Sequence, residues 1–352
     1  MRSLEERLAE RSIQAIEECV CPGGIVGIVK TNGERKFYPF GRQTYSEASS
    51  FVAEDTIYDV ASITKSIPTA SLALTLLDKG ALRLDDAVMK YVPEYNGGSA
   101  ESVAITHLLT YTIDGVALSS LVSKTADEIL QFVYSQKPTS KPGSVFRYSN
   151  TPALLLGLIV ERVFGVGLGQ AASDNFFRPL KMKRTGFLPG RQLQSEIAPT
   201  EMSGGGELRG IVHDESARVF AREERVVGHA GLFSCAPDLV IFLEMLLKGG
   251  KLDGRRYFSN KTIRNMATNQ IQELGDSTGL GWELNQPHFM GKHSSVHTFG
   301  KTGFTGCSVV CDIERDVAFV LLTNRTYPKR PADNSAINVF RSDIADAVFE
   351  GI

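Results

Sequence analysis

Short apolar runs near both ends of the chain predict β-strands. Near the N-terminus, the segment GGIVGIVKTNGERKFYPFGRQ (23–43) is typical of two strands joined by a turn at Asn32-Gly33. Near the C-terminus, three segments are strand-like: SVHTFGKTG (295–303), GCSVVCDIE (306–314) and VAFVLLTNR (317–325). The sheet-forming segments therefore come from the two ends of the chain.

Between these ends, apolar residues recur with the spacing of helices. The helical segments are SLALTLLDKGAL (71–82), ADEILQFVYSQ (126–136), TPALLLGLIVERVFG (151–165) and APDLVIFLEMLLKGG (236–250). The first 20 residues and the last 18 (335–352) are amphipathic in the same way. The glycine-rich stretch EMSGGGELRGIVHDESA (201–217) predicts a long surface loop.

This order favours a single α+β domain over residues 1–352. We expect an α/β lobe from about 1–60 and 230–352, with a helical lobe from about 61–229 inserted into it. Pockets form preferentially at such junctions, so we expect a cleft between the lobes. Ser62 lies where the helical block begins.

Composition narrows the possible partners. Lys plus Arg total 38 and Asp plus Glu total 40, giving a formal net charge of −2 with the charges scattered singly. This balance gives no reason to expect nucleic acid or an acidic membrane as a partner, and we expect a small-molecule substrate. Nothing in the sequence predicts the oligomeric state.

The N-terminus lacks the apolar core of a signal peptide, and no stretch of 18 apolar residues predicts a membrane span. The sequence as written therefore predicts a cytoplasmic protein, with an exported form trimmed of its leader as the alternative. The five cysteines, an odd count, are expected to be free thiols.

Candidate chemistry begins in the segment ASITKSIPTA (61–70), where Ser62 and Lys65 would share one face of a helix. A serine hydroxyl needs a base beside it to act as a nucleophile at neutral pH. A desolvated lysine can be that base, or a protonated lysine can lower the pKa of a nearby tyrosine that serves instead. Pro68 is expected to bend this helix, because it removes a helical hydrogen bond.

The S-x-x-K pattern is weak by itself, but two further motifs accompany it. Tyr148-Ser149-Asn150 lies just before an apolar helix, and Lys301-Thr302-Gly303 ends a predicted strand. Each of the three patterns occurs once in the chain. Three segments far apart in the sequence could thus converge on one cleft.

S-x-x-K and K-T-G are motifs of serine β-lactamases and penicillin-binding proteins. Together with Tyr148-x-Asn150, they resemble class C β-lactamases, serine D-alanyl-D-alanine carboxypeptidases and their esterase relatives. The segments LDDAVMKYVPEY, ITHLLTYT and GHAGLFSCAPDL extend the resemblance over nearly the whole chain. It implies the β-lactamase/transpeptidase-like fold, an antiparallel sheet flanked by terminal helices with an inserted helical region.

The resemblance also implies a role for each motif residue. Ser62 would be the acylated nucleophile, with Lys65 and Tyr148 as the base system. Asn150 would hold the substrate amide, and Lys301, Thr302 and Gly303 would form the wall that binds a substrate carboxylate. The backbone N–H groups of Ser62 and Phe304 would form the oxyanion hole. Lys301 would also lower the pKa of Tyr148.

No cofactor and no metal are expected. His213, Asp214 and Glu215 are adjacent, and neighbouring residues rarely point at one ion. His229, in GHAGLFS, is interpreted as a residue that orders a turn.

The predicted activity is a serine acyl hydrolase that forms an acyl-enzyme with β-lactams or D-alanyl-peptide-like carboxylates. The alternatives are an esterase or peptidase for small cytoplasmic substrates, and a non-catalytic β-lactam or peptide sensor or scaffold.

Overall fold

The strands from the two chain ends form one antiparallel sheet. The computed structural model describes residues 2–351, and its largest sheet has seven strands in the order β10-β11-β12-β13-β14-β1-β2. These strands are β1 (Gly23–Lys30), β2 (Arg35–Gly41), β10 (Thr278–Gly279), β11 (Trp282–Leu284), β12 (Phe299–Thr302), β13 (Ser308–Asp312) and β14 (Val317–Thr323). Because β1 pairs with β14, Ile25 lies opposite Leu322.

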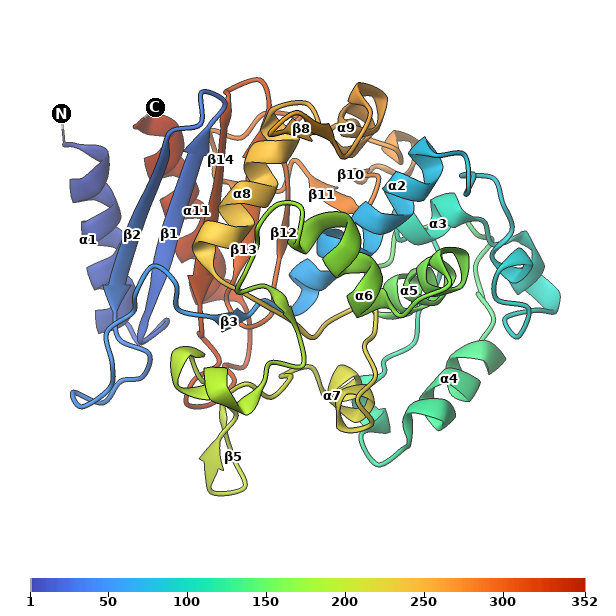
Figure 1. The fold of residues 1–352 in the computed structure, drawn as a ribbon, viewed down its shortest axis with the longest axis horizontal. Helices are drawn as coiled ribbons and strands as arrows, with labels where there is room; N and C mark the ends of the chain where they lie inside the picture. The colour runs from blue at the N-terminus through green and yellow to red at the C-terminus, as the bar shows by residue number, and fades with distance from the viewer. Residues whose placement is uncertain (1, 352) are drawn as a thin grey trace.

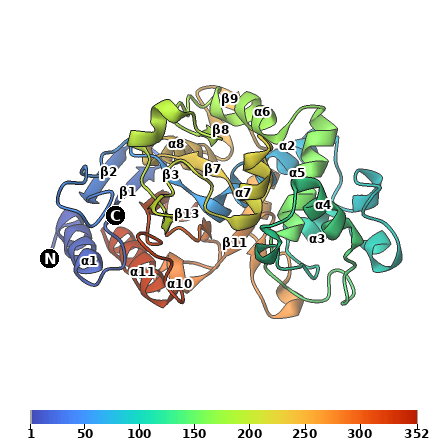
Figure 2. The same cartoon turned by 90° about the horizontal axis from the view of Figure 1, so that it is seen from below.

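Helices cover both faces of this sheet. Figures 1 and 2 show α1 (Leu4–Glu17) and α11 (Ser335–Glu350) against one face and α8 (Ala236–Leu247) against the other. Alternate side chains of β1 point to opposite faces of the sheet. Val26 and Ile28 belong to the core under α1 and α11, whereas Ile25 and Val29 belong to the larger core on the other face. Burial on both faces explains why β1, β13 and β14 are continuous apolar runs in the sequence.

The rest of the chain forms the helical region and several small sheets. Its α-helices are α2 (Ser71–Asp78), α3 (Ile105–Leu109), α4 (Ala126–Ser135), α5 (Thr151–Phe164), α6 (Leu168–Ala172) and α7 (Glu215–Arg222), with α9 (Asn260–Met266) and α10 (Pro287–Met290) near the sheet. Short 3₁₀ helices lie at Val88–Lys90, Gly98–Ser102, Ser119–Leu121, Arg191–Glu196 and Gln272–Leu274, and a π turn lies at Ser173–Phe177. The small strands are β3 (Tyr58–Asp59), β4 (Gly186–Phe187), β5 (Met202–Ser203), β6 (Gly206–Glu207), β7 (Leu232–Ser234), β8 (Lys251–Leu252) and β9 (Arg255–Arg256).

The helix that begins near Ser62 is made of three unlike parts. A 3₁₀ helix, η1 (Ala61–Lys65), is followed by a π turn, η2 (Ser66–Ala70), and then by α2. Ile67 leaves helical geometry with φ −119° and ψ 107°. Pro68 explains the break, because a proline disfavours helical geometry in the residue before it. The expected bend at Pro68 is therefore present.

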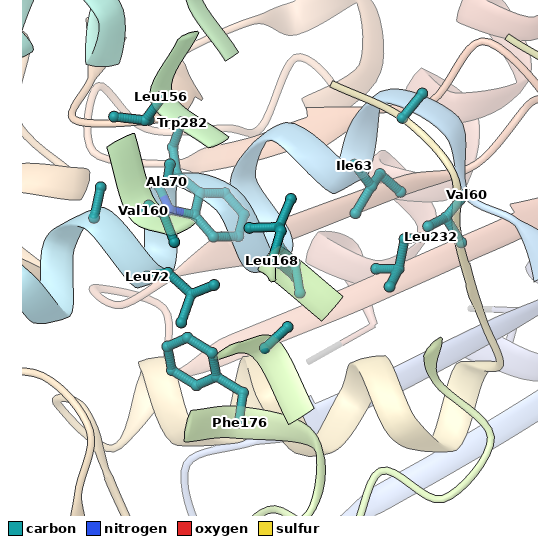
Figure 3. Packing of buried hydrophobic residues seen from close by; sticks show 14 of the residues in the cluster. Val60, Ile63, Ala70, Leu72, Leu156, Val160, Leu168, Phe176, Leu232 and Trp282 are labelled. Carbon is teal, nitrogen blue, oxygen red and sulfur yellow. The ribbon is translucent and has the colours of Figure 1, made fainter. Parts of the chain in front are cut away.

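The segment from Val60 to Leu72 runs through the centre of the larger core. Figure 3 shows apolar side chains around it from β7, β11, α5, α6 and the π turn at Ser173–Phe177: Leu232, Trp282, Leu156, Val160, Leu168 and Phe176. Ile63, Ile67 and Leu72 are all fully buried. This packing fixes the position of the turn that carries Ser62.

The predicted α+β class and the predicted sheet with flanking terminal helices are confirmed. The division into two lobes remains a prediction. The predicted surface loop at 201–217 is correct for the β5–β6 hairpin, whose residues are largely exposed, but wrong for 213–217, where α7 begins and His213 and Ser216 are buried.

Of the helices in residues 2–351, none has the length and apolar composition to cross a membrane by itself. The stretch Thr151–Phe164 taken with Leu168–Phe177 meets both criteria as a pair, with a bend of 74° between them.

Candidate active site

Ser62 and Lys65 are in direct contact within η1. The Lys65 ammonium nitrogen lies 2.8 Å from Ser62 Oγ and donates a second hydrogen bond, also 2.8 Å, to the carbonyl of His229. Lys65 is 1% exposed. Burial lowers its pKa, and the positive charge of Lys301 acts in the same direction, although Tyr148 and Asp214 oppose them. A lysine with a lowered pKa beside a serine hydroxyl can accept its proton.

The backbone just before Ser62 is held in an uncommon conformation. Ala61 has φ +46°, in the left-handed region that costs a non-glycine residue about 1–2 kcal/mol. Asp59 stabilises this turn, because one carboxylate oxygen accepts from the backbone N–H of Ala61 and the other from that of His213, each at 2.8 Å. Asp59 thereby links the nucleophile turn to the segment that enters α7.

Tyr148 projects its ring between the two lysines. The ammonium of Lys301 lies 4.4 Å from the centre of that ring, and the ammonium of Lys65 lies 5.4 Å away. The ring of Tyr111 packs against Tyr148 with 5.3 Å between centres. Desolvation of the Tyr148 hydroxyl would by itself raise its pKa, but the charges of Lys301 and Lys65 outweigh it and hold that pKa below its usual value near 10.

Asn150 and Asp214 connect this group to α7. The Asn150 amide lies 3.3 Å from one oxygen of Asp214, whose other oxygen accepts from Ser216 Oγ at 2.7 Å and lies 3.3 Å from His229 Nε2. Burial opposes the charge of Asp214, but His229 and backbone donors hold its pKa well below its usual range. Asp214 is therefore a charged carboxylate that contacts the histidine whose carbonyl binds Lys65.

The opposite wall is the end of β12 and the turn after it. Lys301 is 1% exposed and forms an ion pair with Glu283 of β11. Gly303 lies so close to the nucleophile turn that a Cβ there would be 2.3 Å from the carbonyl oxygen of Val60. The guanidinium of Arg341 in α11 holds the turn by donating to the carbonyl of Gly303 at 2.7 Å.

A cavity of about 280 Å³ lies between these elements. It is lined by Ala61, Ser62, Tyr148, Asn150, His213, Asp214, Glu215, Ala230, Thr302, Gly303, Phe304, Arg330, Asn334 and Arg341. Its rim is crossed by an ion pair of 2.6 Å between Glu215 and Arg330. The exposed ring of Phe304 stacks on His213 with 5.9 Å between centres. A small acyl group could enter and meet Ser62 Oγ.

The sequence-predicted residues all lie at this cavity or directly behind its wall. Ser62, Tyr148, Asn150, Thr302, Gly303 and Phe304 line it, whereas Lys65 and Lys301 do not. Lys65 lies beneath Ser62, and Lys301 lies beside the ring of Tyr148.

Sequence reasoning did not select Asp214, Glu283 or Tyr111 as functional candidates. In the sequence, Asp214 was considered only as a possible metal ligand, together with His213 and Glu215. Within residues 2–351, no group of three or more His, Cys, Asp or Glu side chains is arranged to hold a metal ion. For Glu283 the sequence carried no signal, because its contact with Lys301 depends on the pairing of β11 with β12.

Comparison with known proteins gives a consistent result. Residues 4–341 match the family model described as Beta-lactamase. A curated protein of Escherichia coli K12, named "Putative D-alanyl-D-alanine carboxypeptidase", is 30% identical over 324 residues, covering 82% of this chain and 73% of that protein. A second relative with the same name, from Escherichia coli O157:H7, is 31% identical with the same coverage.

Solved structures share the fold. A penicillin-binding protein homologue from Caulobacter crescentus has a TM-score of 0.78 at 20% identity, covering 100% of this chain and 98% of that one. EstCE1, described as a hydrolase with promiscuous acyltransferase activity, has a TM-score of 0.77 at 22% identity, covering 98% of each chain. At these identities the likeness shows the fold alone.

Proposed function

Because this chain belongs to the β-lactamase family, we propose that it is a serine acyl hydrolase that works through an acyl-enzyme on Ser62. The observation that carries the proposal is the 2.8 Å contact between Lys65 Nζ and Ser62 Oγ at the floor of a cavity that Tyr148 also lines. Nucleophile and base within hydrogen-bond reach are the geometry that this chemistry needs.

The acylation step follows from these positions. Ser62 Oγ attacks the substrate carbonyl carbon, and its proton passes to the neutral amine of Lys65 or to the Tyr148 phenolate. The carbonyl oxygen becomes an oxyanion that the backbone N–H groups of Ser62 and Phe304 would stabilise, each typically contributing about 3 kcal/mol. When the intermediate collapses, the bond to the leaving group breaks and the leaving atom takes that proton, either directly from Tyr148 or from Lys65 by way of Tyr148.

Deacylation reverses these steps with water as the nucleophile. Water loses its proton to the same base and attacks the ester carbon, and Ser62 Oγ leaves with a proton. The carboxylic acid product then departs, and no other reactant is required.

Relatives carry the name "Putative D-alanyl-D-alanine carboxypeptidase", and this name supports carboxylate-bearing substrates such as D-alanyl peptides and β-lactams for the present chain. The burial of Lys301 and its pairing with Glu283 favour a second class, uncharged esters and amides, because that ammonium does not line the cavity.

The test is intact-protein mass spectrometry after incubation with a chromogenic cephalosporin or with p-nitrophenyl butyrate, with hydrolysis followed in the same sample. A mass increase that Ser62→Ala abolishes and Ser203→Ala leaves intact would support the proposal, since Ser203 lies on the exposed β5–β6 hairpin. An adduct that forms equally in Ser62→Ala would contradict it. A lasting adduct with little turnover would indicate a sensor, and wild-type protein that forms no adduct with either compound and hydrolyses neither would indicate a scaffold.

A further inference from the structure

Glu283 is a charged group behind the cavity wall that the mechanism above does not use. It lies in β11 opposite Gly300 of β12, beside Lys301. Its side chain is 18% exposed, and Lys301 Nζ donates to Oε1. The other oxygen, Oε2, is buried and has no hydrogen-bond partner within residues 2–351. Neither Glu283 nor Lys301 lines the cavity.

The ion pair fixes where the ammonium of Lys301 can be. Held by Glu283, it lies 4.4 Å from the centre of the Tyr148 ring, on the ring rather than in the cavity. Burial opposes the charge of Lys301, but Glu283 and Tyr148 outweigh it and hold the pKa of Lys301 above its usual value. Lys301 therefore stays charged, and the carboxylate of Glu283, in direct contact with it, balances that charge.

We propose that Glu283 is a positioning and specificity-determining residue: it holds Lys301 within the wall against Tyr148 and so makes the cavity prefer acyl esters and amides that are uncharged beside the scissile bond. A substrate carboxylate near Lys301 would be attracted by the ammonium and repelled by Glu283, so the two effects oppose each other. Two arginines that line the cavity already have partners: Arg330 pairs with Glu215, and Arg341 donates to the carbonyls of Gly303 and Cys307. This inference rests on the proposed function, since it concerns the substrate class of the same site.

The second consequence concerns the base. Glu283 raises the pKa of Tyr148, whereas Lys301 and Lys65 lower it. Removing the charge of Glu283 should therefore lower the pKa of Tyr148 further and move the acid limb of the pH profile to lower pH. The charged or titratable groups that face Glu283 are Lys301 of β12, Tyr111, Tyr148, His288 of α10 and Arg341 of α11.

The experiment compares two esters that differ in one charge, p-nitrophenyl butyrate and mono-p-nitrophenyl succinate, with wild-type protein, Glu283→Gln and Glu273→Gln, from pH 5 to 9. Glu273 is exposed in the 3₁₀ helix at Gln272–Leu274, so Glu273→Gln removes the same charge away from the site. Glu283→Gln should raise the ratio of kcat/KM for the succinate to that for the butyrate by about tenfold or more. It should also move the acid limb of the pH profile to lower pH. Glu273→Gln should change neither the ratio nor the acid limb.

The inference would be overturned if folded Glu283→Gln kept the succinate-to-butyrate ratio of kcat/KM within twofold of wild type and left the acid limb of the pH profile where it is. If Glu283→Gln does not fold, Lys301→Met decides, because the proposal expects it to slow both esters equally. A selective loss of the succinate in Lys301→Met would overturn the inference. Wild-type hydrolysis of either ester that persists in Ser62→Ala would overturn the proposed function itself and the inference with it, so the two failures are distinguishable.

Discussion

Replacing Tyr148 by phenylalanine tests the base system with the smallest possible change. Tyr148→Phe removes one hydroxyl and keeps the ring that lies 4.4 Å from the ammonium of Lys301 and 5.3 Å from the ring of Tyr111. Tyr148 is 45% exposed, so the free energy of unfolding should change by no more than about 0.5 kcal/mol. Any large effect on acylation would therefore come from the lost proton acceptor.

The expected loss follows from the contribution of a positioned general base, typically about 10²- to 10⁴-fold in rate. At about 1.36 kcal/mol for each factor of ten, the barrier to acylation should rise by about 2.7–5.4 kcal/mol. The sign of the pH effect follows from the lysines, which hold the pKa of Tyr148 below its usual value near 10. Wild-type acylation should rise with pH as Tyr148 loses its proton, and in Tyr148→Phe this limb should disappear.

The assay is the rate at which the acyl-enzyme forms, measured by stopped flow with p-nitrophenyl butyrate at several pH values. Tyr111→Phe is the matched control, because Tyr111 is buried against the same ring and lies outside the cavity lining. It should acylate within a few fold of wild type. If Tyr148→Phe acylates within threefold of wild type while Ser62→Ala does not acylate, Tyr148 is not the proton acceptor and Lys65 must be.

Three further predictions concern the turn at Gly303, the titration of Asp59 and the exposure of the cysteines. Gly303→Ala should lose activity and at least about 2 kcal/mol of stability in chemical denaturation, because its Cβ would lie 2.3 Å from the carbonyl of Val60. Gly186→Ala, with no atom within 4 Å of the new carbon, should be near neutral; equal losses would contradict the clash. Burial raises the pKa of Asp59 to about 6, so between the unfolded pKa near 3.9 and about pH 6 the folded state binds more protons than the unfolded state, and the contribution of Asp59 to stability should fall by about 3 kcal/mol as pH rises from 4 to 7. Asp59→Asn should flatten this part of the pH dependence of unfolding, and an unchanged slope would exclude Asp59 as its source. A thiol reagent should modify one cysteine, Cys19, in the folded protein and all five in denaturant, since the other four are buried; two or more fast thiols in the folded protein would contradict this.

The parts of the site that could be predicted are those that depend on local spacing. Ser62 and Lys65 are three residues apart, which brings their side chains together on any helical turn, and the structure has them 2.8 Å apart. Strands β1, β13 and β14 could be predicted because both of their faces are buried, which leaves short continuous apolar runs in the sequence. The break at Ile67 followed from Pro68.

The parts that could not be predicted depend on contacts between distant segments. Glu283 is 18 residues before Lys301, and only the pairing of β11 with β12 brings the two together. Asp214 lies in a polar stretch of the sequence that predicts a loop. In the structure it caps the start of α7 and lies beside His229. No local sequence pattern predicts that Lys301 is buried and paired with Glu283.

The two lysines of the site lie in different surroundings, and this difference separates the parts that each can take in the chemistry. Burial lowers the pKa of Lys65, whose hydrogen bonds within residues 2–351 go to uncharged oxygens, those of Ser62 and His229. Lys301 is as deeply buried but touches the carboxylate of Glu283, which holds its pKa above the usual value. Groups of one type whose environments separate their pKa values take different parts in acid–base chemistry. We infer that Lys65 is the lysine able to exchange a proton with Ser62, whereas Lys301 supplies a fixed positive charge that favours the Tyr148 phenolate. On this reasoning the carboxylate of Glu283 acts on the proposed base system in two opposing ways: it keeps Lys301 charged, and it raises the pKa of Tyr148 directly.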